Sequence, residues 1–209
     1  MPRHSPSRRT FALLFIPLLA PAAASPRQDG PALTPDKIFA AIGVREGITV
    51  CEVGAGDGKM TLAVARLVGP AGRVYSSELG DQRVTSLKEK VADSGLAQIS
   101  VVSGDVTATN FPDAACDALF MSDVYHHFSD PAAMNASMAN ALKPGGRAAI
   151  ADFMPPDKEA PVPADRDNDG MHGVLPDTVA REMKDAGLEL VASESGWRWF
   201  LSVFSKPKS

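Results

Sequence analysis

The chain has 209 residues, of which 44% are hydrophobic and 22% are charged, a composition typical of one globular domain with a substantial core. The formal net charge is −4, and because residues 1–24 hold three arginines and no acid, the rest of the chain carries −7. An acidic surface of this kind disfavours nonspecific binding to nucleic acid or anionic lipid. We therefore expect no nucleic-acid partner.

Residues 1–25 have the three-part pattern of a secretory signal peptide. Arginines precede a short apolar run over 11–20, and alanines at 22–24 provide an Ala-x-Ala cleavage site. The apolar run is short and contains a proline, so no stable membrane span is expected. The pair Arg8-Arg9 also resembles a twin-arginine signal. The pattern predicts export to the periplasm, with a cytoplasmic location if the leader is not used.

Residues 26–34 are rich in proline and glycine and read as a linker to one domain over 35–209. Thr34-Pro35 favours the start of a short helix over 37–42. Strands and helices then alternate along the chain, which predicts an α/β, doubly wound, mostly parallel sheet with helices on both faces. We expect strands over 48–53, 73–78, 98–103, 116–122 and 146–152, and helices over 58–67, 81–93, 131–142 and 176–186.

The C-terminal part departs from this alternation. Apolar stretches over 188–192 and 197–204 flank the turn residues 194–196. Two strands joined by a short glycine-containing turn form an antiparallel hairpin. We therefore expect a hairpin at the end of the chain.

A glycine-rich turn follows the first predicted strand and precedes a helix. Glu52 is followed by Gly54, Gly56 and Gly58 at alternate positions. Such glycines allow a sharp turn and leave space for a ligand against the backbone. A dinucleotide-binding turn would need its third glycine at position 59, which is Lys59. The spacing therefore disfavours a nicotinamide-binding site.

This acidic-x-Gly-x-Gly-x-Gly pattern resembles the first motif of class I S-adenosylmethionine-dependent methyltransferases, and the resemblance covers about residues 35–205. It implies a Rossmann-like, seven-stranded sheet whose C-terminal antiparallel hairpin lies at one edge. It also implies S-adenosyl-L-methionine as the cofactor, bound by Glu52, Gly54, Ala55, Gly56 and Gly58.

Further cofactor contacts are expected beyond the carboxyl ends of the second and third strands, where open parallel sheets bind ligands. Glu78 is placed to accept hydrogen bonds from a ribose diol, although an ordinary solvated carboxylate is the alternative. Leu79 would pack on the adenine. By the resemblance, Gly104, Asp105 and Val106 would lie at the adenine amino group.

The segment after the fourth strand would lie between the cofactor and the substrate. The resemblance places Ser122 and Asp123 beside the methionine part of the cofactor, and Tyr125 and His126 toward the substrate. A histidine here could act as a general base or could only shape the pocket. No metal is expected, because the adjacent pair His126 and His127 point in different directions and no third ligand has clear spacing.

An acidic loop follows the fifth strand. Asp165, Asp167 and Asp169 match the front half of a calcium loop, but its twelfth position is Pro176 rather than glutamate. We favour a mobile loop over the substrate pocket, with calcium binding as the alternative. His172, at the end of this loop, could reach the pocket as a catalytic residue.

The two cysteines fall in the predicted core. Cys51 is expected near the end of the first strand and Cys116 near the start of the fourth. On neighbouring parallel strands, these positions lie at opposite ends, so a disulfide is doubtful. Two buried thiols are the favoured interpretation.

Methyl transfer from a sulfonium requires alignment and exclusion of water more than strong catalytic groups. Ser122-Asp123-Val124-Tyr125 replaces the Asn-Pro-Pro-aromatic or Asp-Pro-Pro-aromatic segment of enzymes that methylate the amino groups of DNA bases. We therefore expect a methyltransferase with a small-molecule acceptor. The alternatives are a nucleoside-binding module of the same fold without turnover, and a nicotinamide oxidoreductase.

Overall fold

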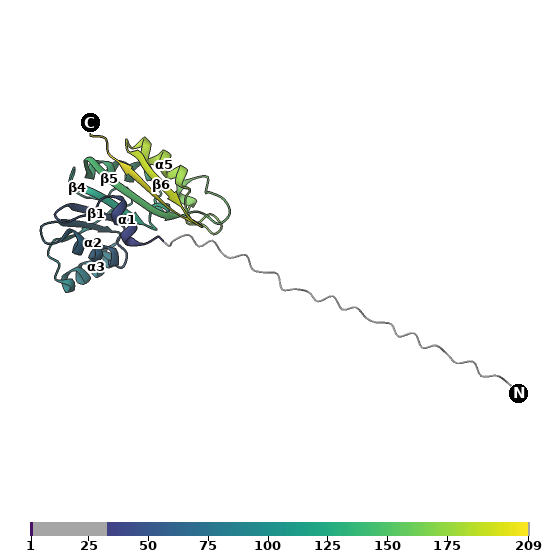
Figure 1. Ribbon diagram of the computed structural model, residues 1–209, viewed down its shortest axis with the longest axis horizontal. Helices are drawn as coiled ribbons and strands as arrows, with labels where there is room; N and C mark the ends of the chain where they lie inside the picture. Colours follow the sequence, from purple (N-terminus) through teal and green to yellow (C-terminus); the bar gives the residue numbers. More distant parts are fainter. Residues whose placement is uncertain (2–32, 209) are drawn as a thin grey trace.

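The computed structural model describes Met1 and residues 33–208 (Figure 1). Apart from Met1, the predicted signal peptide lies outside the described residues, and so does nearly all of the predicted linker. Within the part that is described, no helix combines the length and the apolar character that a membrane crossing requires.

One seven-stranded sheet forms the centre of the domain, and its strand order is β3-β2-β1-β4-β5-β7-β6 (Figure 1). The first five strands run parallel, and β7 pairs antiparallel with both β5 and β6. This arrangement confirms the predicted fold class and the C-terminal hairpin. The strands are β1 (Thr49–Val53), β2 (Arg73–Glu78), β3 (Ile99–Ser103), β4 (Cys116–Ser122), β5 (Leu142–Phe153), β6 (Glu189–Ser195) and β7 (Trp199–Ser205).

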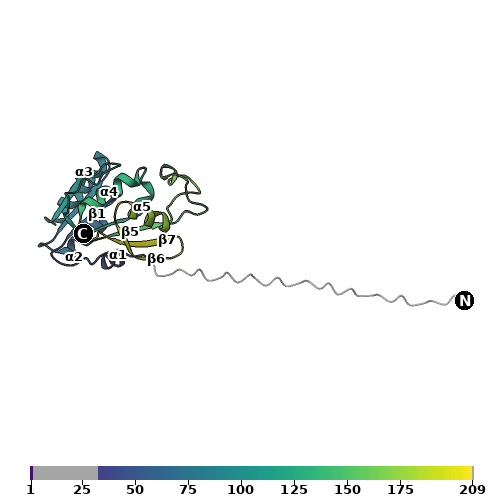
Figure 2. The same cartoon turned by 90° about the horizontal axis from the view of Figure 1, so that it is seen from above.

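Helices cover both faces of the sheet. Side chains of α1 and α2 share one core cluster, which α3 also contacts, and side chains of α4 and α5 share a second. Figure 2 shows α1 and α2 on the opposite side of the sheet from α4 and α5. The helices are α1 (Pro35–Ala41), α2 (Lys59–Val68), α3 (Asp81–Ser94), α4 (Pro131–Ala141) and α5 (Pro176–Asp185), with short 3₁₀ turns η1 (Tyr125–His127) and η2 (Pro163–Asp165).

Alternation along the central strands separates the two core clusters. Val50 and Phe120 pack with the α1 and α2 side, whereas Cys51 and Leu119 pack with the α4 and α5 side. Successive side chains of a strand point to opposite faces, so an apolar run without polar alternation is buried on both. This is why the continuous apolar stretches of the sequence became central parallel strands.

The expected absence of a disulfide is wrong. Cys51 and Cys116 are bonded, with their Cα atoms 5.8 Å apart. The prediction assumed a regular ladder, and the β1–β4 register does set Cys51 opposite Leu119, three residues from Cys116. The structure nevertheless brings Cys116 next to Cys51, at the point where the β4–β5 pairing becomes irregular. Both residues lie in the same core cluster and are fully buried. The bond therefore ties β1 to β4 inside the core.

Candidate functional site

A cavity of about 560 Å³ lies beyond the carboxyl ends of β1, β2 and β4 and beside the loop that follows β3. This is the position at which open parallel sheets bind ligands. Nine of the twelve predicted cofactor residues line it: Gly54, Gly56, Glu78, Leu79, Gly104, Asp105, Val106, Ser122 and Asp123.

The glycine turn approaches the cavity with its backbone. Gly54 has a φ of +72°, and a Cβ atom there would lie 2.6 Å from Cγ2 of Val124. Gly56 has a φ of +52°, and no atom lies within 4 Å of the place its Cβ would occupy. Position 54 therefore requires glycine for conformation and for space, whereas position 56 borders open volume.

Two other residues of the turn do not line the cavity. Ala55 is buried, and its N–H donates to the carbonyl of Ser77 at 3.0 Å. Gly58 precedes α2, where an added Cβ would meet Leu87 of α3 at 2.8 Å. These residues hold the turn against β2 and α3, so their part is to position Gly54 and Gly56.

Glu52 also lies beneath the turn and not in the cavity. Its buried carboxylate accepts hydrogen bonds from the hydroxyls of Thr61 and Ser76, the latter at 2.7 Å. Burial raises the pKa of Glu52 to about 7, and the negative charge of Glu78 contributes to the same shift. The structure thus places Glu52 as a buried support that joins β1, α2 and β2.

Glu78 occupies the end of β2 at the cavity wall. One carboxylate oxygen accepts the N–H of Gly56 at 2.6 Å, and the other accepts the N–H of Leu79 at 2.9 Å. Arg83 lies 3.6 Å away and also lines the cavity. A carboxylate offers about four lone-pair sites. Glu78 is therefore held in place by the backbone while retaining acceptor capacity for two further hydroxyl groups.

The wall next to Glu78 is apolar yet exposed. Leu79 is 42% exposed and Val106 is 57% exposed, and both line the cavity. Asp105 accepts hydrogen bonds from the backbone and hydroxyl of Thr107, each at 3.3 Å. Apolar side chains exposed beside a carboxylate suit a planar base whose amino group points toward the acid.

Asp123 lies at the opposite wall, immediately after β4. It adopts a φ of +56°, and its N–H donates to the carbonyl of Ala151 at 2.9 Å. A non-glycine residue in this region is strained, and such strain concentrates at functional sites. Partial burial and the nearby carboxylate of Asp152 raise the pKa of Asp123. Asp123 is therefore the titratable side chain on the side of the cavity that Ser122 and Asp123 form.

Tyr125, which we expected to face the substrate, is instead fully buried away from the cavity. Its hydroxyl donates to Glu182 at 2.9 Å and accepts from the amide of Asn135 at 2.7 Å. Glu182 also pairs with the buried Arg166. The η1 turn directs the ring of Tyr125 into the core between α4 and α5, so the residue serves packing.

His126 is also buried, with 1% of its side chain exposed, and it does not line the cavity. Its Nδ1 lies 2.8 Å from one carboxylate oxygen of Asp152, and its backbone N–H donates to the other oxygen at 3.1 Å. Nε2 has no hydrogen-bond partner. Asp152 thus fixes the orientation of the ring, and Nε2 is left without a hydrogen bond.

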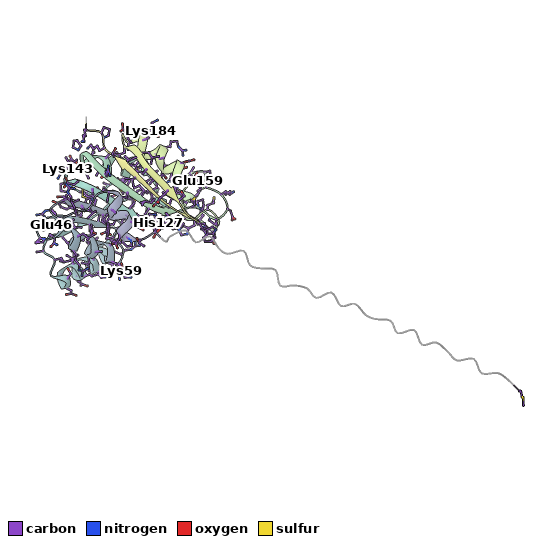
Figure 3. All side chains as sticks on the ribbon, viewed as in Figure 1. Glu46, Lys59, His127, Lys143, Glu159 and Lys184 are labelled. Atoms are coloured by element: carbon purple, nitrogen blue, oxygen red, sulfur yellow. A yellow bond between two sulfur atoms is a disulfide. The ribbon has the colours of Figure 1, made fainter. Side chains whose placement is uncertain are left out.

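The acidic loop brings Asp167 to the cavity wall next to His127, which Figure 3 labels. Asp167 Oδ1 lies 2.7 Å from Nδ1 of His127 and 3.6 Å from Nε2 of His172. His172 does not itself line the cavity.

Four residues at the cavity or behind it were not among the predicted site residues: Arg83, His127, Asp152 and Asp167. His127 was weighed from the sequence only as a metal ligand, and Asp167 only as part of a calcium-like loop over the pocket. Asp152 had a readable signal, because it is the acidic residue near the carboxyl end of the fifth strand. The positions of the other three depend on a loop, a short turn or a helix side chain. No sequence rule comparable to the strand-end rule predicts which of these side chains reach the cavity.

Comparison with known proteins bears on what this cavity binds. Residues 51–150 match the family model described as a methyltransferase domain. A ubiquinone/menaquinone biosynthesis C-methyltransferase of Cronobacter sakazakii is 31% identical over 154 residues, which are 73% of this chain and 61% of that protein. The homologue of Marinomonas sp. is 31% identical over 118 residues, which are 56% of this chain and 47% of that protein. The chain thus spans about half the length of the curated relatives it matches.

Among solved structures, an S-adenosylmethionine-dependent methyltransferase from Aquifex aeolicus has a TM-score of 0.68 at 25% identity, covering 82% of this chain and 88% of that one. The family model, the relatives and this solved structure are all described as methyltransferases, and the solved structure is described as dependent on S-adenosylmethionine.

Proposed function

We propose that this protein is an exported class I methyltransferase that moves a methyl group from S-adenosylmethionine to a small-molecule acceptor. The observation that carries the proposal is Glu78, held by two backbone N–H groups at the glycine turn. From there it can accept both hydroxyls of a ribose, with Leu79 and Val106 beside the base and Asp123 at the far wall.

The chemistry is an in-line displacement. The acceptor's nucleophilic atom forms a bond to the methyl carbon while the carbon–sulfur bond breaks, and sulfur keeps the electron pair as a neutral thioether. The acceptor's proton, where one is lost, passes to a base or to water. Asp123 is the residue we assign to that end of the cavity, because its raised pKa brings it nearer to neutrality. The protein's main contribution is alignment.

A small molecule is the acceptor class that the cavity favours. The same 560 Å³ must hold the methionine part of the cofactor and the acceptor's reacting group. The net charge of −4 argues against nucleic acid as the acceptor. The relatives' names describe C-methyltransferases of quinone biosynthesis, which act on small molecules.

Turnover is tested by release of S-adenosylhomocysteine from S-adenosylmethionine in the presence of a panel of phenols, quinols and small amines. We expect one chemical class to stimulate release in proportion to its concentration. Tight cofactor binding without release by any acceptor would favour the second candidate, a nucleoside-binding module of the same fold.

Export is the part of the proposal that concerns location. What supports it is the leader pattern over 1–25 together with the Cys51–Cys116 bond, because disulfides persist in oxidising compartments. S-adenosylmethionine is made in the cytosol, and a twin-arginine route would carry the folded protein with its cofactor bound.

Expression of the full chain in a Gram-negative host, followed by fractionation and intact-mass measurement, tests export. We expect a periplasmic chain that begins near Ser25 and contains the oxidised cysteine pair. An uncleaved cytoplasmic chain with two free thiols would contradict the proposal.

A further inference from the structure

Three histidines converge on one carboxylate at the rim of the cavity. The Oδ1 atom of Asp167 lies 2.7 Å from Nδ1 of His127, 3.6 Å from Nε2 of His172 and 3.9 Å from Nε2 of His126. The ring centroids of His126 and His172 are 4.8 Å apart. Residues 126 and 127 come from η1, and the other two come from the loop between β5 and α5. Two separate segments therefore build the cluster.

The buried member of this cluster has a lone pair that nothing satisfies. Asp152 accepts the Nδ1–H of His126, which leaves Nε2 as the unprotonated nitrogen of the neutral ring. Nε2 is buried without a hydrogen-bond partner and faces a carboxylate oxygen. The buried nitrogen and the carboxylate oxygen are both hydrogen-bond acceptors, so a cation between them would satisfy both.

The hydrogen bond between His126 and Asp152 is of the kind that orients metal-binding histidines. Such histidines donate their second ring N–H to a carboxylate, which fixes the tautomer and makes the ligating nitrogen more basic. Asp152 is itself held, since it also accepts the N–H groups of His126 and Phe153. The ring of His126 therefore cannot rotate away, and Nε2 keeps its aim toward Asp167.

The spacing also fits a metal site. Ligands about 2.0–2.1 Å from a tetrahedral zinc ion stand about 3.3 Å from one another. The ligand atoms of His126, His127 and Asp167 all lie within 4.8 Å of one another, and His172 is 3.6 Å from the carboxylate. Three of the four side chains are exposed enough to adjust toward an ion, since His127, Asp167 and His172 are each about half exposed.

We propose that His126, His127, Asp167 and His172 bind a divalent transition-metal ion of the Zn²⁺ class, and that Asp152 is a positioning residue for His126. Imidazole with one carboxylate is the donor set that zinc, iron and nickel share. The prediction that the chain holds no metal rested on the different directions of the two adjacent histidines and on the lack of a third ligand with clear spacing. The acidic loop and His172 were expected near the substrate pocket, but the sequence did not show that Asp167 and His172 would lie against His126 and His127.

The position of the proposed ion at the cavity suggests a role for it in binding the acceptor. His127 and Asp167 line the same cavity as Asp123. The ion would hold an oxygen atom of the methyl acceptor at that wall, and this extension alone rests on the proposed function. It narrows the acceptor to a small molecule that carries a phenol, enol or hydroxy-carbonyl oxygen.

The test is calorimetric titration of the metal-free full chain, without a histidine tag and without S-adenosylmethionine, with Zn²⁺. Co²⁺ absorption in the visible range serves as an independent readout of coordination. We expect one equivalent of metal, and at least tenfold weaker binding in Asp167→Ala and in His172→Ala. Asp169→Ala is the matched control, because Asp169 is an exposed acid of the same loop outside the cluster, and it should bind as the unchanged chain does.

Asp152→Asn tests the positioning role, with a loss of about 10–100-fold in metal affinity expected. Circular dichroism melts verify that each variant folds. Failure of the unchanged chain to bind Zn²⁺, or equal binding by the Asp167 and His172 variants, would overturn the proposal and leave a hydrogen-bonded histidine cluster. Because no cofactor is present, a failure here is distinct from a failure of the proposed methyltransferase function.

Discussion

At the residue scale, two glutamates near the glycine turn have different environments and different tasks. Glu78 lines the cavity and is held by the N–H groups of Gly56 and Leu79. Glu52 lies below the turn, bonded to the hydroxyls of Thr61 and Ser76. The sequence motif treats both as cofactor residues, but only Glu78 is placed to touch a ligand.

Glu78→Ala is therefore expected to weaken S-adenosylmethionine binding by about 5- to 150-fold, which corresponds to about 1–3 kcal/mol for hydrogen bonds to a charged group. Calorimetric titration measures the change. Glu89→Ala, which removes an exposed acid of α3 outside the cavity, is the matched control and should leave the affinity unaltered. Equal affinity in both variants would remove Glu78 from the site.

Glu52 gives a prediction about pH. Its pKa is raised from 4.5 to about 7 in the folded chain, so the folded state holds a proton that the unfolded state releases between these values. Stability contributed by this group is therefore present below about pH 4.5 and is lost as pH rises to 7, by roughly 3 kcal/mol.

Glu52→Gln keeps an acceptor for Thr61 and Ser76 but does not titrate. We expect the free energy of unfolding of the variant, relative to the unchanged chain, to increase between pH 4.5 and pH 7. Urea unfolding at both pH values measures it. Parallel pH profiles for the two proteins would show that burial does not shift this carboxyl group.

At the element scale, the sequence predicted where the strands lie along the chain better than it predicted which of their side chains meet. The alternation of apolar runs with helical segments located all five parallel strands, and the stretches at 188–192 and 197–204 located the hairpin of β6 and β7. The alternation of side chains along a strand tells which face of the sheet each one occupies. It does not tell which residue of the neighbouring strand lies beside it. The close approach of Cys116 to Cys51 therefore could not be foreseen, and neither could the disulfide.

The disulfide gives a stability prediction for β1 and β4. Replacing both cysteines by alanine removes a cross-link between residues 65 positions apart. In the chain-entropy account, such a loop contributes about 4 kcal/mol. We expect the double variant to melt well below the oxidised chain and to show no change on addition of reductant. A melting temperature equal to that of the oxidised chain would mean that the bond constrains nothing.

At the scale of the whole molecule, the parallel half of the sheet builds the cavity, and the loop between β5 and α5 adds Asp167 to its rim. The cavity position follows from strand order, so its residues after β2, β3 and β4 could be predicted from their place in the sequence. The histidine cluster could not, because it depends on the folding of the 154–173 loop back onto η1. Long irregular loops carry function without a periodic signal.

The measurement that bears most directly on the central claim is calorimetric titration of the chain without residues 1–24 with S-adenosylmethionine, S-adenosylhomocysteine and NAD. We predict micromolar or tighter binding of the two sulfur nucleosides and no binding of NAD, because the third glycine is at position 58 and not 59. Binding of NAD without binding of either sulfur nucleoside would contradict the account.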